Sequence, residues 1–281
     1  MPQCPIFTIS ILIKLFGAAK KSNNLFETLC YNPAKGPAVE ESPGKILPFY
    51  PFFAMRDLLK RTAVMLTEEG HFLGGYPMLE THITDTNMIP FGSFNATTLD
   101  WEFNYGSAPY PQRFPQPYIM TNTTSTQIGA LGRCIVQFAS ADEKIERSAL
   151  AVLFANNLMS FYLHVPAGLK LHPFFYQARN YVFKFGYDHD DTVIYPGWDD
   201  ANPVKVTPKD VKATAVKRAN GDILLLVGNI GEAASATISL GNFANGRIID
   251  AMTEERLGDG NAITIPVGKH DFRLIRVEKA Q

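Results

Sequence analysis

The stretch that decides the fold of the C-terminal part is VKATAVKRANGDILLLVGNIGEAASATISLGNFANGRIIDAMTEERLGDGNAITIPVGKHDFRLIRVEK, residues 211–279. Short runs rich in Val, Ile, Leu and Thr alternate with turn sequences such as Asn-Gly, Gly-Asp and Gly-Asp-Gly. The runs VKATAVKR, DILLLVGNI, SATISLG, GRIIDAM, NAITIPV and FRLIRVEK therefore predict strands. Their spacing predicts an antiparallel β-sandwich over residues 206–281, with a domain boundary near Val206.

Upstream of this sandwich, helical and strand-like segments alternate. The spacing of apolar residues predicts helices over residues 54–69, 124–134, 142–162 and 173–185. A short strand is expected over residues 76–83, and a long loop follows through residues 90–117. This alternation is typical of α/β layers, so the fold class is α/β plus all-β.

Residues 1–53 show neither a helical nor a strand period and are interpreted as a leader or remnant. The apolar run Ile6–Leu15 is about ten residues long, against the roughly 20 needed to span a bilayer. No Lys or Arg precedes it, so it is a poor secretory signal. We expect a soluble protein, cytoplasmic or exported, with the compartment undecided.

Composition excludes several classes of function. The 281 residues are 46% apolar and include 26 basic and 27 acidic residues, which leaves a net charge of −1. Nucleic acid and anionic membranes are therefore not expected partners. Three cysteines without CxxC spacing predict neither a disulfide framework nor a zinc knuckle. The sequence has no GxSxG, P-loop or GxGxxG after a strand, so no cofactor is expected.

The stretch richest in chemistry is LETHITDTNMIPFGSFNATTLDWEFNYG, residues 79–106. In strands, Glu80 and His82 would share one face, and the same geometry would put Asp100 and Glu102 together, with Trp101 turned away. Paired carboxylates beside aromatic rings are what cleavage of a glycosidic bond needs: one protonates the leaving oxygen and one stabilises or attacks the anomeric carbon. Acids in loops also commonly hydrogen-bond backbone N–H groups, so this structural role remains an alternative for each acid.

Two further arrangements of polar residues stay open. A metal site would draw on imidazole and carboxylate ligands, although the spacing fits no compact ligand motif; its members would be His71, Glu80, His82, Asp85 and Asp100. The acids of Tyr187–Asp191 and Trp198–Asp200 are interpreted first as turn-forming residues of an interdomain loop, and second as ligands.

Three runs carry a family resemblance. RDLLKRTAVML, THITDTNMIPFGSFNATTLDWEFNYG and FGYDHDDTVIYPGWDDANPVKV resemble the later part of large bacterial glycoside hydrolase-like proteins related to glycoside hydrolase family 123, over roughly residues 50–281. The resemblance implies a (β/α) TIM-type barrel with an appended sandwich and an active site at the carboxyl ends of its strands. A whole barrel takes about 250 residues, so only a partial barrel, residues 54–205, is expected. The adjacent Asp-Glu pair of family 123 has no counterpart in a matching strand.

The sequence thus predicts a glycoside hydrolase-like protein acting on a poly- or oligosaccharide. The acid and the nucleophile or base are expected among Glu80, Asp100 and Glu102. The side chains expected to bind the sugar are His82, Asp85, Trp101, Tyr105 and Trp198. The alternative is a truncated, non-catalytic remnant that binds carbohydrate or self-associates. Under either interpretation a homo-oligomer is expected, because a partial barrel leaves sheet edges to cover.

Overall fold

The fold is described from a computed structural model of the chain. It describes residues 39–47, 52–70, 72–73, 76–77, 79–82, 94, 96–103, 108–122 and 131–279. The chain divides into two compact units, one of residues 1–101 and 121–134 and one of residues 102–120 and 135–281. The predicted segments 1–53, 54–205 and 206–281 are a different division, and their boundaries remain predictions.

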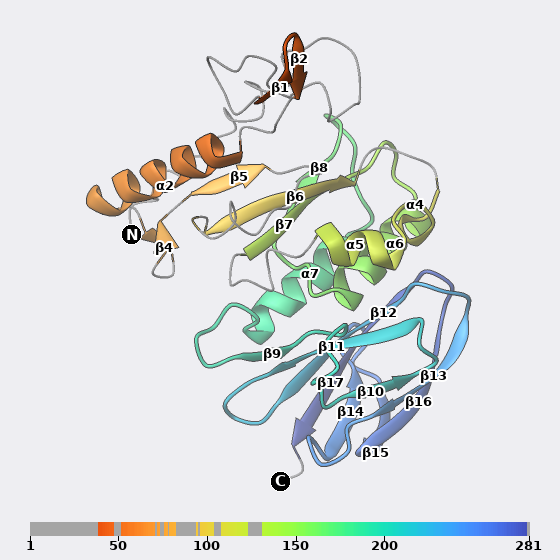
Figure 1. Cartoon of the computed structure of the whole chain (residues 1–281). Coiled ribbons are helices and arrows are strands. Elements are labelled where there is room, and N and C mark those ends of the chain that lie inside the picture. Colours follow the sequence, from red (N-terminus) through yellow and green to blue (C-terminus); the bar gives the residue numbers. More distant parts are fainter. Residues whose placement is uncertain are drawn as a thin grey trace. The chain divides into compact units, whose positions relative to one another are not determined.

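The larger unit contains two antiparallel sheets (Figure 1). One has the order β10-β13-β16, with bounds Lys205–Thr207, Ala234–Ser239 and Ala262–Val267. The other has the order β15-β14-β17-β12-β11-β9, with bounds Arg256–Gly260, Gly246–Asp250, Phe272–Lys279, Ile223–Asn229, Val211–Lys217 and Val193–Tyr195. All six predicted runs form strands, so the predicted β-rich sandwich region is confirmed at the level of its strands. The sequence did not predict β9, β10 or β15.

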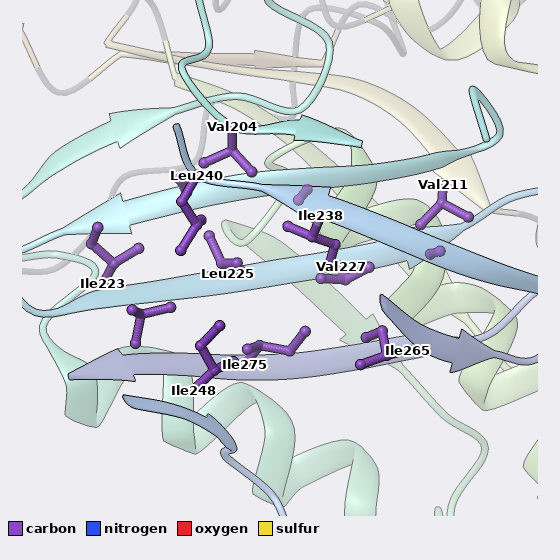
Figure 2. Packing of buried hydrophobic residues seen from close by; sticks show 14 of the residues in the cluster. Val204, Val211, Ile223, Leu225, Val227, Ile238, Leu240, Ile248, Ile265 and Ile275 are labelled. Atoms are coloured by element: carbon purple, nitrogen blue, oxygen red, sulfur yellow. The ribbon is translucent and has the colours of Figure 1, made fainter. Parts of the chain in front are cut away.

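The sandwich core lies between these two sheets. Alternate residues of β12, including Ile223, Leu225 and Val227, meet Ile238 of β13 and Ile265 of β16 (Figure 2). All five side chains are at most 3% exposed. Alternation of inward and outward side chains along an antiparallel strand produces this arrangement, as the period-two sequence pattern predicts.

The opposite face of β12 packs against a helix. Every residue of β12 is buried, and the helix α6 (Glu143–Ala155) contacts β12, β11 and β17 (Figure 1). Gly228 lies against the helix backbone, because a Cβ there would come within 2.0 Å of the carbonyl oxygen of Ala151. The six-stranded sheet is therefore covered on both faces, which explains the uninterrupted apolar run ILLLVGN.

Polar side chains form hydrogen bonds with backbone groups at both ends of α6. At its start, the carboxylate of Asp142 accepts hydrogen bonds from the N–H groups of Lys144 and Ile145. At its end, the buried hydroxyl of Thr214 donates to the carbonyl of Phe154 at 2.9 Å. The same hydroxyl accepts from the N–H of Gly197 at 3.0 Å. Thr214 thus joins the helix, the sheet and the chain after β9.

A second set of strands has the order expected of a (β/α) fold. The strands β5 (Glu80–His82), β6 (Thr97–Phe103), β7 (Leu131–Gln137) and β8 (Phe161–His164) follow one another in a sheet in chain order. β5 and β6 pair in parallel. α6 connects β7 to β8, and α7 (Pro173–Phe185) follows β8. Helices that alternate with strands in this order are consistent with the partial barrel that the sequence predicts.

The smaller unit holds shorter elements. β1 (Val39–Ser42) and β2 (Lys45–Leu47) form an antiparallel pair, as do β3 (Phe72–Leu73) and β4 (Tyr76–Pro77). The helix α2 (Phe52–Glu68) matches its predicted span within two residues. None of the helices in the described residues is long and apolar enough to cross a membrane.

Four predicted elements differ from the structure. The single strand predicted over residues 76–83 is two short strands, β4 and β5, which belong to different sheets. Residues 131–134 belong to β7 and not to the predicted helix 124–134, because strand pairing overrides local helical spacing, and Ile135 and Val136 favour a strand. The predicted helix 142–162 ends at Ala155, where Asn156 caps it and Asn157 takes a positive φ of 59°. The predicted loop 90–117 contains β6, α4 (Tyr110–Arg113) and the start of α5 (Gln116–Asn122).

Candidate functional site

The predicted acids lie on the paired strands β5 and β6. Glu80 pairs with Thr97 and His82 with Leu99, in parallel register. Asp100 and Glu102 follow the last residue of β6 that pairs with β5, in the carboxyl half of β6. Alternate positions of a strand belong to opposite faces, and partners in a parallel pair share a face. The register therefore assigns Glu80 and His82 to one face and Asp100 and Glu102 to the other.

The other predicted site residues are distributed between described and undescribed parts of the chain. Trp101 occupies β6 between the two acids. Asp85 and Tyr105 lie outside the described residues. Whether the predicted side chains converge on one hollow remains a prediction.

Trp198 lies in a turn of the larger unit, between β9 and β10, and is half-buried. The turn is held from inside by Asn202, whose amide group donates to the carbonyls of Tyr195, Pro196 and Ala213 at 2.9–3.1 Å. Asp199 accepts from the N–H of Ala201 at 2.8 Å. The turn-forming role expected for this acid is confirmed, and the ring of Trp198 stays a predicted stacking surface.

Asp191, of the second predicted acidic group, also has a structural partner. Its carboxylate lies 3.1 Å from the guanidinium of Arg218, which in turn donates to the carbonyl of Phe185 at the end of α7. The hydrogen bond from Arg218 lowers the pKa of Asp191 below its ordinary value. This acid joins the end of α7 to the β11–β12 turn.

The strands β7 and β8 end next to each other, and polar side chains lie near these two ends. The N–H of Phe138 donates to the carbonyl of His164 at 3.1 Å, so the two strands end side by side. His164 is exposed, and residues 165–172 lead from it into α7. We call Phe138, His164 and residues 165–172 the β7–β8 edge. In (β/α) folds the loops at the carboxyl ends of parallel strands carry the functional groups.

A buried carboxylate organises this edge. Glu146, in the first turn of α6, is 0% exposed. Its Oε2 accepts from the backbone N–H of His172 at 2.8 Å, and its Oε1 lies 3.0 Å from the ring Nδ1 of the same residue. The hydrogen bond that the carboxylate of Glu146 accepts raises the pKa of His172 above its ordinary value, with smaller contributions from the charges of Glu143 and Asp142.

An aromatic and cationic cluster lies beside His172. The imidazole of His172 stacks on the ring of Phe174, with centroids 5.9 Å apart and an interplanar angle of 24°. The guanidinium of Arg147 lies 5.2 Å from the Phe174 centroid and 5.0 Å from that of Phe272. Arg147 also donates to Asp271 at 2.6 Å, which ties α6 to the start of β17.

Sequence reasoning missed Glu146, His164 and His172. A signal for Glu146 was present, because it is four and seven residues before Leu150 and Leu153 on the buried side of α6. For His172 the only signal was its place directly before Pro173, which begins α7. Neither pattern is specific enough to indicate that the two side chains meet.

Two other possible sites can be compared with these residues. A hollow of about 390 Å³ lies along α2 and is lined by Asp57, Lys60, Arg61, Val64, Met65 and Glu68, none of which was predicted to be functional. Within the described residues, no group of three or more His, Cys, Asp or Glu side chains is arranged to hold a metal ion. His71 and Asp85, which the metal alternative needs, lie outside that part of the chain.

Comparison with solved structures gives the fold its context. A GH27 β-L-arabinopyranosidase from Geobacillus stearothermophilus, in complex with arabinose, matches with a TM-score of 0.51 at 11% identity, over 80% of this chain and 55% of that chain. The wild-type form of that protein matches with a TM-score of 0.51 at 12% identity, over 80% of this chain and 54% of that chain. The fold is glycoside hydrolase-like. The α-galactosidase I from Mortierella vinacea is less similar, with a TM-score of 0.45 at 14% identity over 67% of this chain and 54% of that chain.

The chain spans about half the length of these structures. No family model matches the sequence, and no curated protein matches it. The narrower resemblance to family 123 therefore remains a prediction, while the broader likeness to glycoside hydrolases in fold is confirmed.

Proposed function

We propose that this protein hydrolyses glycosidic bonds in a poly- or oligosaccharide through a pair of carboxylates on β6. The observation that carries the proposal is the position of Asp100 and Glu102, two residues apart in the carboxyl half of a strand that pairs in parallel with β5. In barrel enzymes, catalytic groups lie at the carboxyl ends of strands. The glycoside hydrolase-like fold supports a carbohydrate as the ligand.

The register ranks the three predicted acids. Glu80 begins β5, whereas Glu102 is the penultimate residue of β6 and Asp100 precedes it by two. Since catalytic groups cluster toward the carboxyl ends, Glu102 and Asp100 are the favoured pair. Glu80, on the other face of the sheet, is the weaker candidate. His82, Asp85, Trp101, Tyr105 and Trp198 are proposed to contact the sugar.

The test is hydrolysis of a panel of aryl glycosides that includes aryl β-L-arabinopyranosides, together with polysaccharides. We expect Glu102→Gln and Asp100→Asn each to lower kcat by about 10²–10⁴-fold, the usual contribution of a general acid or base. Glu232→Gln is the matched control, because Glu232 is an exposed carboxylate paired with Lys269 in the sandwich. Unchanged rates in both β6 variants, with normal folding, would remove this pair from the mechanism.

Two predictions about assembly and binding accompany this test. A chain that binds an oligosaccharide in calorimetry, yet hydrolyses nothing in the panel, would favour the non-catalytic carbohydrate-binding alternative.

The proposed homo-oligomer is checked by light scattering at micromolar concentration. A monomer there would contradict it.

A further inference from the structure

The Glu146–His172 pair holds an imidazole ring in a fixed orientation. Both carboxylate oxygens of Glu146 are used by one residue, since Oε2 accepts the backbone N–H of His172 and Oε1 faces Nδ1. Glu146 is 0% exposed and is carried by a helix that is closed at both ends. A histidine held by a buried partner at both its backbone N–H and its ring Nδ1 loses little further entropy when the ring binds a ligand.

This attachment decides which nitrogen is available. Because Nδ1 faces a carboxylate, the neutral ring carries its proton on Nδ1 and leaves Nε2 as an acceptor. The side chain of His172 is 40% exposed, and Nε2 makes no hydrogen bond to any of the described residues. Nε2 is therefore available to accept a hydrogen bond from water or from a ligand hydroxyl.

The surroundings of the ring match the needs of sugar recognition. His172 is the last residue of the β7–β8 edge, in the segment that leads from the carboxyl end of β8 into α7. The rings of His172 and Phe174 are stacked, and α7 also carries the exposed ring of Tyr176, two residues after Phe174. Aromatic surface with a few fixed polar atoms is the usual composition of a small-molecule site.

We propose that His172 is a saccharide-binding residue, with Nε2 accepting a hydrogen bond from a sugar hydroxyl, and that Glu146 is its positioning residue. The inference rests on the proposed function, because it takes its ligand class from it. The competing explanation is that the pair only ties α6 to α7.

The first experiment observes the ring directly. The full-length protein is labelled with ¹⁵N-histidine, and the two ring nitrogens of His172 are followed by NMR. The probe is the aryl glycoside that the wild type hydrolyses best, measured in the Glu102→Gln variant, or arabinose if none is hydrolysed. We expect a protonated Nδ1, an unprotonated Nε2 at high pH, and a saturable shift of Nε2 on adding the probe.

The second experiment uses variants and pH. We expect His172→Gln to weaken binding of the same probe about threefold to tenfold, the effect of one hydrogen bond. Binding to wild type should also weaken as the pH falls through the pKa of His172, because protonation removes the acceptor. The charges that face the ring are Glu146, Glu143 and Asp142, and Arg147 lies beyond Phe174. In His172→Gln, binding should no longer weaken at low pH. In Glu146→Gln, the pH at which binding falls to half should be lower than in wild type.

His189→Gln is the control, because His189 is an exposed histidine in the turn after α7. A probe that binds or is hydrolysed without shifting Nε2, and without a weakening at low pH that depends on His172, would overturn this inference and leave the proposed function standing. Loss of activity in the β6 acid variants is independent of that result. If the chain binds no saccharide at all, both proposals fall together.

Discussion

The sandwich and the α6–β8–α7 segment belong to one compact unit but use their polar side chains differently. In the sandwich, the buried amides of Asn202 and Asn229 donate to backbone carbonyls and hold turns. In the other segment, buried Glu146 holds the ring of a half-exposed histidine. Polar groups used entirely by the backbone stabilise a scaffold, whereas a buried group that orients an exposed one prepares a surface for binding. This difference is the reason we propose the binding residue in the (β/α) segment and not in the sandwich.

The largest expected effect tests the contact between β12 of the sandwich and α6. Gly228→Ala would place a methyl group within 2.0 Å of the Ala151 carbonyl, a backbone atom that cannot move aside cheaply. We expect a loss of about 3 kcal/mol in the free energy of unfolding, measured in urea. Gly258→Ala is the control, because its Cβ would meet only the side chain of Ile263, at 3.6 Å. Equal stability of the two variants would mean that α6 does not pack on β12 this closely.

A second test removes the polar connection between helix and sheet. Thr214→Val keeps the shape of the side chain but leaves the carbonyl of Phe154 and the N–H of Gly197 without their hydroxyl partner. We expect a loss of about 1–3 kcal/mol in the free energy of unfolding, because the N–H of Gly197 loses its acceptor, whereas the Phe154 carbonyl keeps the backbone N–H groups that cap α6. Thr237→Val on the exposed face of β13 is the control and should change stability little. Similar losses for both would contradict the bridging role of Thr214.

A third test concerns the start of α6, which carries Glu146 and so holds His172 of the β7–β8 edge. Asp142→Ala removes the acceptor for the N–H groups of Lys144 and Ile145, and we expect a loss of about 1 kcal/mol. Asp142→Asn keeps an acceptor and should restore most of the stability. The measurement is thermal or urea unfolding of the three proteins. An Asn variant as unstable as the Ala variant would show that charge, and not capping, is what matters.

The smallest expected effect is on the pH dependence of stability, which tests the Glu146–His172 pair. The pKa of His172 is raised in the folded state by its hydrogen bond to Glu146. The stability that protonation adds is therefore fully present below the ordinary value of 6.5 and is lost as the pH rises through the raised folded pKa. We expect the difference in unfolding free energy between wild type and His172→Gln to shrink over that range. A difference that is constant with pH would show that the pair contributes no ionic stabilisation.

The two regions also differ in how far the sequence determines them. In the sandwich, the alternation of residues such as Ile223, Leu225 and Val227 between turn signals is a local pattern, and every predicted run became a strand. The span of α7 follows equally from Pro173 at its start and Gly186 at its end. Around β7 the local pattern was ambiguous, because a short apolar run fits a helix or a strand until its partner is known.

The candidate site depends even more on tertiary structure. The sequence alone showed that acidic and aromatic residues cluster along the chain near Trp101, and it predicted the strands of the sandwich and the burial of α6. Only the tertiary structure decided that Glu80 and Asp100 occupy opposite faces, and that Glu146 meets His172 from 26 residues away. The physical reason is that periodicity records which face of an element is apolar, whereas strand register and contacts between distant side chains are set by packing that no local pattern encodes.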